Sequence, residues 1–307
     1  MKKILMVFIG VLVAILGYNF FGTEKNIDSL KEKIVVEHSG GITEVVKNPE
    51  NIVVFDYGIL DTLNYLDVEV KGVVKSSLPS FLSRFQDEKY QNAGGLKEPD
   101  FEKIYAMQPE LIIISGRQEP FYKQLSEIAP TIYLATNGED YIANFKKNHE
   151  IIGKIFGKEE EVKVAVEKIE KKIEGIKEYI TNKKYTGLVT LSNNGKISAY
   201  GEKSRFGMIH SYFGFKGLDE IKASNHGSSV TFEYVLEKDP DFLFVIDRAA
   251  VAGGDVKANK AFDNSIIHST SAFKNNRIIF LDAEVWYNST GGISSTEKMI
   301  SEMGNLK

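Results

Sequence analysis

Residues 101–117 have the sequence FEKIYAMQPELIIISGR, and residues 232–248 have the sequence FEYVLEKDPDFLFVIDR. The two stretches align without a gap, Phe232 standing 131 positions after Phe101. Each contains Phe-Glu, a short helical pattern, proline followed by an acid, an apolar strand, and an arginine just past the strand end. A repeated supersecondary unit of this kind predicts two structurally related lobes.

Further apolar runs flank both copies. Residues 33–37, 52–55, 68–74, 187–191, 196–200 and 278–281 have strand patterns, and residues 60–66 have a helical one. Strands that alternate with helices predict an α/β fold with mostly parallel sheets.

The middle of the chain differs from both flanks. Residues 141–184 contain no proline and are rich in Lys and Glu. One apolar stripe recurs there at steps of three and four, formed by Val162, Val166, Ile169, Ile173, Ile176 and Ile180. It predicts a long amphipathic helix of about 30 Å or more, which is long enough to bridge two lobes. Gly153 and Gly157 are expected to separate a shorter helix that precedes it.

The first residues predict export. Lys2 and Lys3 precede an uncharged run over 4–21 and a polar exit, which is typical of a signal peptide. The run is also long enough for an uncleaved anchor, and both alternatives stay open. The predicted organisation is a signal peptide or N-terminal membrane anchor (1–25), an N-terminal α/β lobe (26–140), a linking helical segment (141–184) and a C-terminal α/β lobe (185–307).

Composition narrows the function further. The 307 residues carry a net charge of −4 with 43% hydrophobic and 26% charged residues, a globular mixture unlike that of a nucleic-acid binder. There is no cysteine, which rules out disulfides, thiolate metal sites and a lipidated N-terminal cysteine. Phosphate-binding, dinucleotide-binding and nucleophile-elbow motifs are absent, so we expect no enzymatic activity and no intrinsic cofactor.

The arginines are the most informative residues about function, because the chain has only five arginines among 38 basic residues. Arg117 and Arg248 follow equivalent strands of the repeat, and Arg205 lies in a glycine-flanked loop. Ligands of parallel sheets bind at such strand ends, and a planar guanidinium suits an anionic ligand. Local ion pairs, with Glu119 for Arg117 and Asp247 for Arg248, are the alternative.

Two further loop residues are candidates. His226 precedes the second copy of the repeat, and Tyr287 follows the strand at 278–281 beside the single tryptophan. For both, a surface or packing role is the alternative to a functional one. The five histidines show no zinc-site spacing.

The chain resembles the class III (cluster A) substrate-binding proteins of bacterial iron-siderophore and vitamin B12 importers. Five local motifs are similar to those of the enterochelin-uptake (CeuE-type) and petrobactin-binding members, namely residues 115–118, 204–207, 226–234, 245–248 and 285–287. The resemblance covers the chain after residue 25. It implies an α/β fold of two Rossmann-like lobes joined by a long rigid α-helix.

The resemblance also implies roles for individual residues. Arg117, Arg205 and Arg248 match a positive triad that receives an anionic iron-catecholate. His226 and Tyr287 match residues that coordinate Fe(III) when the siderophore is tetradentate. Glu102 and Glu233 match one glutamate per lobe that docks on a membrane permease, although acids in a first helical turn also complement the helix dipole.

The predicted function is therefore an extracytoplasmic binding protein, monomeric and without nucleic-acid partners, in the periplasm or on the outer face of the cytoplasmic membrane. It captures a ferric catecholate siderophore, of the enterobactin or petrobactin kind, and delivers it to an ABC-transporter permease. The alternatives are a haem or cobalamin carrier of the same fold, or an exported α/β hydrolase of siderophore esters. The sequence leaves the particular siderophore open.

Overall fold

The computed structural model describes residues 31–135, 140–218, 221 and 226–306. The predicted signal peptide or anchor (1–25) lies outside these residues. Within them, no helix combines the length and the apolar character needed to cross a membrane. Ile34–Lys307 form one compact unit, to which the elements below belong, although β1 starts one residue earlier.

The N-terminal sheet is parallel throughout. Its order is β5-β4-β3-β6-β7, from the strands β3 (Ile52–Val54), β4 (Gly72–Val73), β5 (Gln91–Asn92), β6 (Leu111–Ile114) and β7 (Thr131–Tyr133). Helices accompany it in chain order: α2 (Tyr57–Tyr65), η2 (Ser80–Gln86), α3 (Phe101–Met107), η3 (Glu119–Phe121) and α4 (Tyr122–Ser126). A hairpin of β1 (Lys33–His38) and β2 (Gly41–Val46) lies against β7, where Ser39 N–H donates to the Tyr133 carbonyl.

The C-terminal sheet is mixed. Its order is β10-β9-β8-β11-β12, from β8 (Gly187–Asn193), β9 (Lys196–Tyr200), β10 (Ser228–Val230), β11 (Phe242–Asp247) and β12 (Ile278–Leu281). The strands β8, β11 and β12 are parallel, as expected, but β9 runs antiparallel to both of its neighbours, β8 and β10. The two-residue turn Asn194-Gly195 reverses the chain between β8 and β9, and its φ angles of 53° and 83° suit a tight hairpin.

The two copies of the sequence repeat have the same local geometry. The helices α3 and α8 (Phe232–Lys238) both end at a left-handed residue, Gln108 and Asp239. The acid after the proline then binds the residue that precedes the neighbouring strand. Glu110 accepts from the Asn51 N–H at 3.3 Å, and Asp241 accepts from the Thr186 N–H at 2.9 Å. The repeat is therefore present in the structure as well as in the sequence.

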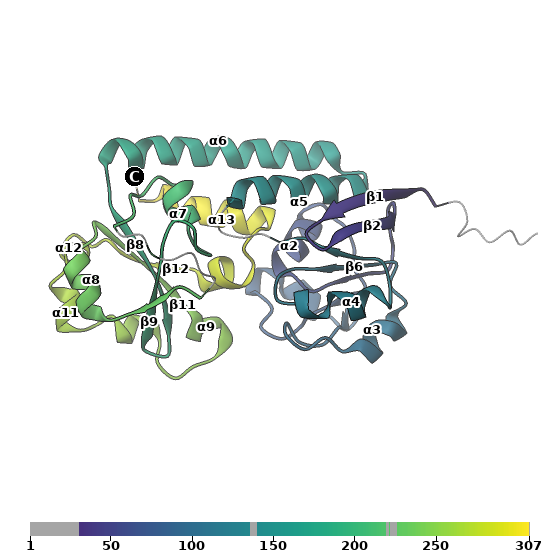
Figure 1. Cartoon of the computed structure of the whole chain (residues 1–307), viewed down its shortest axis with the longest axis horizontal. Coiled ribbons are helices and arrows are strands. Elements are labelled where there is room, and N and C mark those ends of the chain that lie inside the picture. Colours follow the sequence, from purple (N-terminus) through teal and green to yellow (C-terminus); the bar gives the residue numbers. More distant parts are fainter. Residues whose placement is uncertain (1–30, 136–139, 219–220, 222–225, 307) are drawn as a thin grey trace, which may run out of the picture. The chain divides into compact units, whose positions relative to one another are not determined.

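Along the chain, two helices connect the N-terminal sheet to the C-terminal sheet: α5 (Tyr141–Phe156) and α6 (Glu159–Lys183). In Figure 1 the long helix α6 extends past the elements of both sheets. The predicted stripe of α6 is buried, together with Ala165. Gly157 ends α5 in a left-handed conformation, as expected, but Gly153 does not interrupt it. A Cβ at Gly153 would lie 3.2 Å from the Glu159 Cα, so this glycine permits close packing instead.

The last helix, α13 (Ile293–Gly304), packs on α6 and on α2 of the N-terminal half. The buried carboxylate of Asp61 on α2 accepts the Ser295 N–H at 2.7 Å in the first turn of α13. Tyr141 of α5 lies 3.2 Å from Thr296 through their hydroxyls. The C-terminal part of the chain thus returns to the N-terminal half through a buried polar contact.

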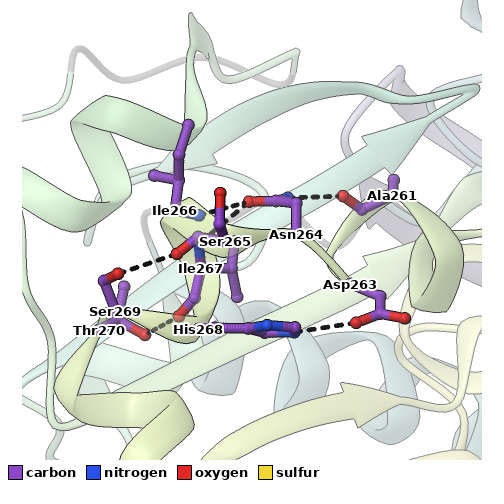
Figure 2. Close-up of polar contacts among 9 residues, drawn as sticks. All are labelled: Ala261, Asp263, Asn264, Ser265, Ile266, Ile267, His268, Ser269 and Thr270. Carbon is purple, nitrogen blue, oxygen red and sulfur yellow. Dashed lines mark hydrogen bonds and ion pairs between the residues drawn. The ribbon is translucent and has the colours of Figure 1, made fainter.

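Short helices complete the C-terminal half: α7 (Met208–Ser211), α9 (Arg248–Ala252), α10 (Ala258–Ala261), α11 (Ser265–His268) and α12 (Ser271–Lys274). Figure 2 shows how side chains hold α11. Asn264 accepts the N–H groups of Ile266 and Ile267 and donates to the Ala261 carbonyl. His268 pairs with Asp263 at 2.8 Å on the surface. Among the described residues, no group of three His, Asp or Glu could hold a metal ion.

The predicted domain boundaries are not tested by these observations and stay a prediction.

Candidate functional site

The candidate site is centred on Tyr287, which lies on the short π-helical turn η5 (Glu284–Asn288) after β12. Trp286 is fully buried, and its indole N–H donates to the Glu302 carboxylate. Tyr287 is half-buried. The turn is tied to the N-terminal half, because Glu284 accepts from the Ser80 N–H at 2.9 Å. Residues from both halves of the chain therefore fix the position of Tyr287.

Three arginines converge on this tyrosine. Arg117 donates to the Tyr287 carbonyl oxygen at 3.0 Å, and Arg205 donates to the same oxygen. The Nε of Arg248 donates to the phenol oxygen at 3.1 Å. The Arg205 and Arg117 guanidinium carbons lie 4.3 and 6.0 Å from the centre of the phenol ring. The structure thus brings together four of the five predicted ligand-binding residues, which we call the arginine cluster.

The fold explains why these three arginines meet. Arg117 follows β6, and Arg248 follows β11 directly as the first residue of α9. Arg205 lies in the turn after β9, where a Cβ at Gly207 would overlap the Glu202 carbonyl, so only glycine fits there. The ends of parallel strands are where open α/β sheets bind ligands. The sequence repeat therefore supplies one guanidinium from each sheet.

Electrostatics in the cluster favour an anion. Burial, and then the positive charge of Arg117, hold the pKa of the Arg205 guanidinium below its ordinary value. Burial alone would raise the pKa of the Tyr287 phenol. The hydrogen bond from Arg248 and the nearby charges of Arg205 and Arg117 more than offset burial, so this pKa is lowered. The positive charges around Tyr287 thus favour the ionised form of its phenol over the neutral form, more than burial disfavours it.

The local ion pairs that were the alternative to a ligand site do not form among the described residues. Asp247 accepts the Ala258 N–H at 2.9 Å, and Glu119 lies 3.4 Å from the Tyr133 hydroxyl. Within the described ranges, no carboxylate lies within ion-pair distance of the three guanidinium groups. A groove of about 420 Å³ between α5 and α6 is different, since Lys146 and Glu170 pair there at 2.9 Å. The cluster is the stronger candidate for an anionic ligand.

His226 lies on the surface, just before β10. The next residue, Gly227, has a φ of 69°, and a Cβ there would lie 2.8 Å from the Tyr200 ring. Tyr200 in turn is close enough to the cluster for Arg205 and Tyr287 to influence its pKa, which burial raises to about 12. The loop that carries His226 therefore lies against a neighbour of the cluster. Its role as a metal ligand stays a prediction.

The sequence analysis did not identify two residues that neighbour the arginine cluster. Asn193, the last residue of β8, accepts from the Nη1 of Arg248 at 2.9 Å. Tyr57 of α2 lies near enough to Arg117 for that charge to affect its pKa, which burial raises. The sequence could have indicated Asn193, because it lies at the end of a predicted parallel strand, and ligands bind at such strand ends.

The predicted docking residues Glu102 and Glu233 are exposed and occupy the first turns of α3 and α8. They lie on different halves of the chain, each on the copy of the repeat that also supplies a cluster arginine. Their role in docking is not tested by the structure.

Comparison with known proteins agrees with this architecture. Residues 52–285 match the family described as periplasmic binding protein. The petrobactin-binding protein YclQ of Bacillus subtilis (strain 168) is 44% identical over 311 residues, covering 99% of this chain and 98% of the relative. Its crystal structure has a TM-score of 0.87 at 45% identity, covering 90% of this chain and 98% of the other.

Two further relatives are similar over most of their length. The crystal structure of the periplasmic catecholate-siderophore binding protein VctP from Vibrio cholerae has a TM-score of 0.86 at 33% identity, covering 89% of this chain and 100% of the other. The ferric-anguibactin-binding protein FatB of Vibrio anguillarum (strain ATCC 68554 / 775) is 31% identical over 284 residues, covering 90% of this chain and 88% of the relative. The predicted α/β fold class is confirmed.

Proposed function

Because the chain belongs to the periplasmic binding protein family, we propose that it is the extracytoplasmic binding protein of an ABC importer and that its cargo is a ferric catecholate siderophore. The named relatives bind petrobactin, a catecholate siderophore and ferric anguibactin. Binding without chemical conversion is the activity that we assign, since the described site presents cations and a phenol but no nucleophile with its base.

The arginine cluster is the observation that carries this proposal. Three guanidinium groups surround Tyr287. Among the described residues, the hydrogen bonds that they donate go to carbonyl, phenol and amide oxygens and to no carboxylate. Guanidinium groups donate strong charge-assisted hydrogen bonds to anionic oxygens and stack on aromatic rings. A ferric catecholate offers both features, because its rings are planar and its oxygens are anionic.

We further propose that Tyr287 and His226 bind the iron of a tetradentate siderophore. Two catecholates supply four negative oxygens and leave two positions of an octahedral ferric ion open. Ferric iron favours oxygen ligands and accepts imidazole. A Tyr287 phenolate and a neutral His226 imidazole would fill those positions, and the lowered pKa of Tyr287 assists the loss of its proton. A tris-catecholate would be held by the arginines alone.

Glu102 and Glu233 are the residues that we propose for docking on the permease, one from each half of the chain. The protein is proposed to act as a monomer. A haem or cobalamin carrier is disfavoured, because those ligands call for an apolar cleft, whereas the cluster concentrates three positive charges.

A titration tests the cargo. The segment from residue 31 onward is titrated with the ferric complex of a linear bis-catecholate, with Trp286 fluorescence and the visible charge-transfer band as signals. Arg205→Gln should weaken binding by about tenfold or more, because it removes a charged donor from a partly buried anion site. Arg84→Gln is the matched control, since Arg84 is exposed and pairs with Glu69 away from the cluster.

The same titration separates the two parts of the proposal. Tyr287→Phe and His226→Ala should shift or remove the charge-transfer band if these side chains bind iron, whereas His268→Ala should not. Quenching with an unchanged band in both variants would contradict iron coordination and keep the arginine site. If the unmodified protein shows no quenching at all, the catecholate proposal is wrong.

A further inference from the structure

Glu302 of α13 binds the turn that carries Tyr287 at two points. One carboxylate oxygen accepts the N–H of Asp282, two residues before η5, at 3.0 Å. The other oxygen accepts the indole N–H of Trp286 at 2.5 Å. A carboxylate offers two acceptor oxygens at once, whereas the amide of a glutamine offers one. Both hydrogen bonds together therefore require the acid at this position.

Burial makes these hydrogen bonds important. Trp286 is fully buried, so its N–H needs a partner inside the protein. Glu302 is half-buried, and burial raises the pKa of its carboxyl, while the hydrogen bonds from Trp286 and Asp282 offset part of this effect. The helix α13 is itself packed on α2 and α6, so the carboxylate is attached to a firm support.

The turn η5 presents the Tyr287 carbonyl oxygen to the arginines. It is a π-helical turn, a form that is rare and frequently found at functional sites. Hydroxyl groups donate to the carbonyls on either side, from Thr290 to Trp286 at 2.8 Å and from Ser295 to Ser289 at 2.7 Å. The Tyr287 carbonyl between them accepts from two arginines of the cluster instead. The conformation of η5 therefore decides where these arginines are held.

From these contacts we infer that Glu302 is a positioning residue for the arginine cluster. It holds Asp282 and Trp286, and so fixes the turn from which Tyr287 offers its carbonyl and its phenol to the three arginines. Glu302 acts through Trp286, the neighbour of Tyr287 in the chain, and not by contact with the ligand. The inference rests on the proposed function, because it makes Glu302 a determinant of the affinity for an anionic cargo.

A fixed turn is needed because three guanidinium groups repel one another. Tyr287 offsets this repulsion by offering oxygen acceptors to all three at fixed points. A site that is arranged before its ligand arrives loses less free energy to the ordering of side chains. If η5 were loosened, the arginines could separate, and their combined attraction for an anion would weaken.

The variant Glu302→Gln tests the inference, because it keeps the size of the side chain but removes one acceptor oxygen. Ultraviolet difference titration gives the pKa of Tyr287, with Tyr287→Phe in the same background as the reference. Glu302→Gln should raise this pKa, because the positive charges move away from the phenol. Affinity for the ferric bis-catecholate, followed by the charge-transfer band, should fall by about threefold or more.

Glu297→Gln is the matched control on the same helix. Glu297 pairs with Lys168 and Lys172 of α6 at 2.7 and 3.5 Å, so its loss weakens α13 without touching η5. Both readouts should stay unchanged in this variant. Trp286→Phe removes the indole donor and should change both readouts in the same direction as Glu302→Gln. In the double variant the two effects should not add, because both substitutions act on the same hydrogen bond.

An unchanged Tyr287 pKa in Glu302→Gln and in Trp286→Phe would overturn the inference. Equal changes in Glu302→Gln and Glu297→Gln would also overturn it, since the cause would then be a general loosening of α13. If Glu302→Gln fails to fold, Trp286→Phe still reports on the same hydrogen bond. If the pKa rises as expected but even the unmodified protein does not bind the ferric bis-catecholate, the positioning role stands and the proposed cargo is wrong.

Discussion

At the scale of single residues, Tyr287 contributes two groups with different consequences. Its carbonyl oxygen accepts from Arg117 and Arg205, and no substitution of the side chain removes that oxygen. Its phenol accepts from Arg248. Tyr287→Phe should therefore leave Arg117 and Arg205 anchored and remove one of the two hydrogen bonds of Arg248, whose other acceptor is Asn193, which makes it a narrow test of the phenol.

Ultraviolet titration of tyrosinate checks the charge state of this phenol. The difference between the unmodified protein and Tyr287→Phe should show one tyrosine that ionises below the ordinary pKa of about 10. Arg248→Gln should raise that pKa, because it removes both a hydrogen bond and a charge. At pH values between the lowered pKa of the native state and the ordinary pKa, the unfolded chain keeps the phenol proton and the native chain has lost it. The free energy of unfolding should therefore rise with pH across this window. A titration at or above the ordinary pKa would contradict this electrostatic argument.

At the scale of elements, α2, α5 and α13 meet at a buried polar contact. The imidazole of His149 on α5 donates from Nδ1 to the Phe145 carbonyl, and its Nε2 lies 3.0 Å from the Thr62 hydroxyl. The Thr62 hydroxyl also accepts from the Ile293 N–H at 3.3 Å. Burial lowers the pKa of His149 to about 4, and the bond to Phe145 offsets only part of this effect.

Because His149 is buried in its neutral form, we predict that the protein loses stability in mild acid. Between pH about 6.5 and about 4 the unfolded chain binds a proton at this residue and the native chain does not. The free energy of unfolding should therefore fall as pH falls through that window, by about 3 kcal/mol in full. Urea unfolding at pH 7 and pH 5 measures it. His149→Gln should show a smaller pH dependence than the control His268→Gln, whose half-buried imidazole pairs with Asp263 outside this contact, and equal slopes would refute the assignment.

Two glycines test the packing of the same elements. A Cβ at Gly58 of α2 would lie 2.6 Å from the Thr290 carbonyl, just before α13, so Gly58→Ala should lower the free energy of unfolding by about 1–3 kcal/mol. A Cβ at Gly175 of α6 meets nothing within 4 Å. Gly175→Ala should raise the same quantity by about 0.5–1 kcal/mol through helix propensity. Chemical denaturation of both variants gives the comparison, and a stabilising Gly58→Ala would show that α2 and α13 do not pack closely.

At the scale of the whole molecule, the two sheets are connected more than once. The helices α5 and α6 join them along the chain, and α13 returns to pack on both α2 and α6. Hinge closure requires a few connecting residues that absorb large backbone changes. A pair of packed helices and the buried hydrogen bond from the Ser295 N–H to Asp61 leave little freedom of that kind.

Small-angle X-ray scattering tests this restriction. The radius of gyration of the segment from residue 31 onward should change little when the ferric bis-catecholate is added at saturating concentration. A clear contraction on binding would contradict the prediction. Tryptophan quenching in the same samples confirms that the site is occupied.

Much of this protein follows from local sequence. The repeat at 101–117 and 232–248 predicts the equivalent helices and strands, because apolar periodicity and proline placement act over a few residues. The stripe on α6 predicts its buried face for the same reason. The scarcity of arginine marks Arg117, Arg205 and Arg248, and the position of two of them after repeated strands predicts a common site.

Other features needed the tertiary structure. The convergence of two arginines on the Tyr287 carbonyl and of a third on its phenol depends on how η5 is tied to Ser80, which lies about 200 residues earlier in the chain. The contact of Asn193 with Arg248 and that of Asp61 with Ser295 likewise depend on how distant segments pack together. Local sequence determined the elements and the kind of side chain at each strand end. Only the folded chain decided which of these side chains meet, because contacts between distant segments depend on packing that no local pattern encodes.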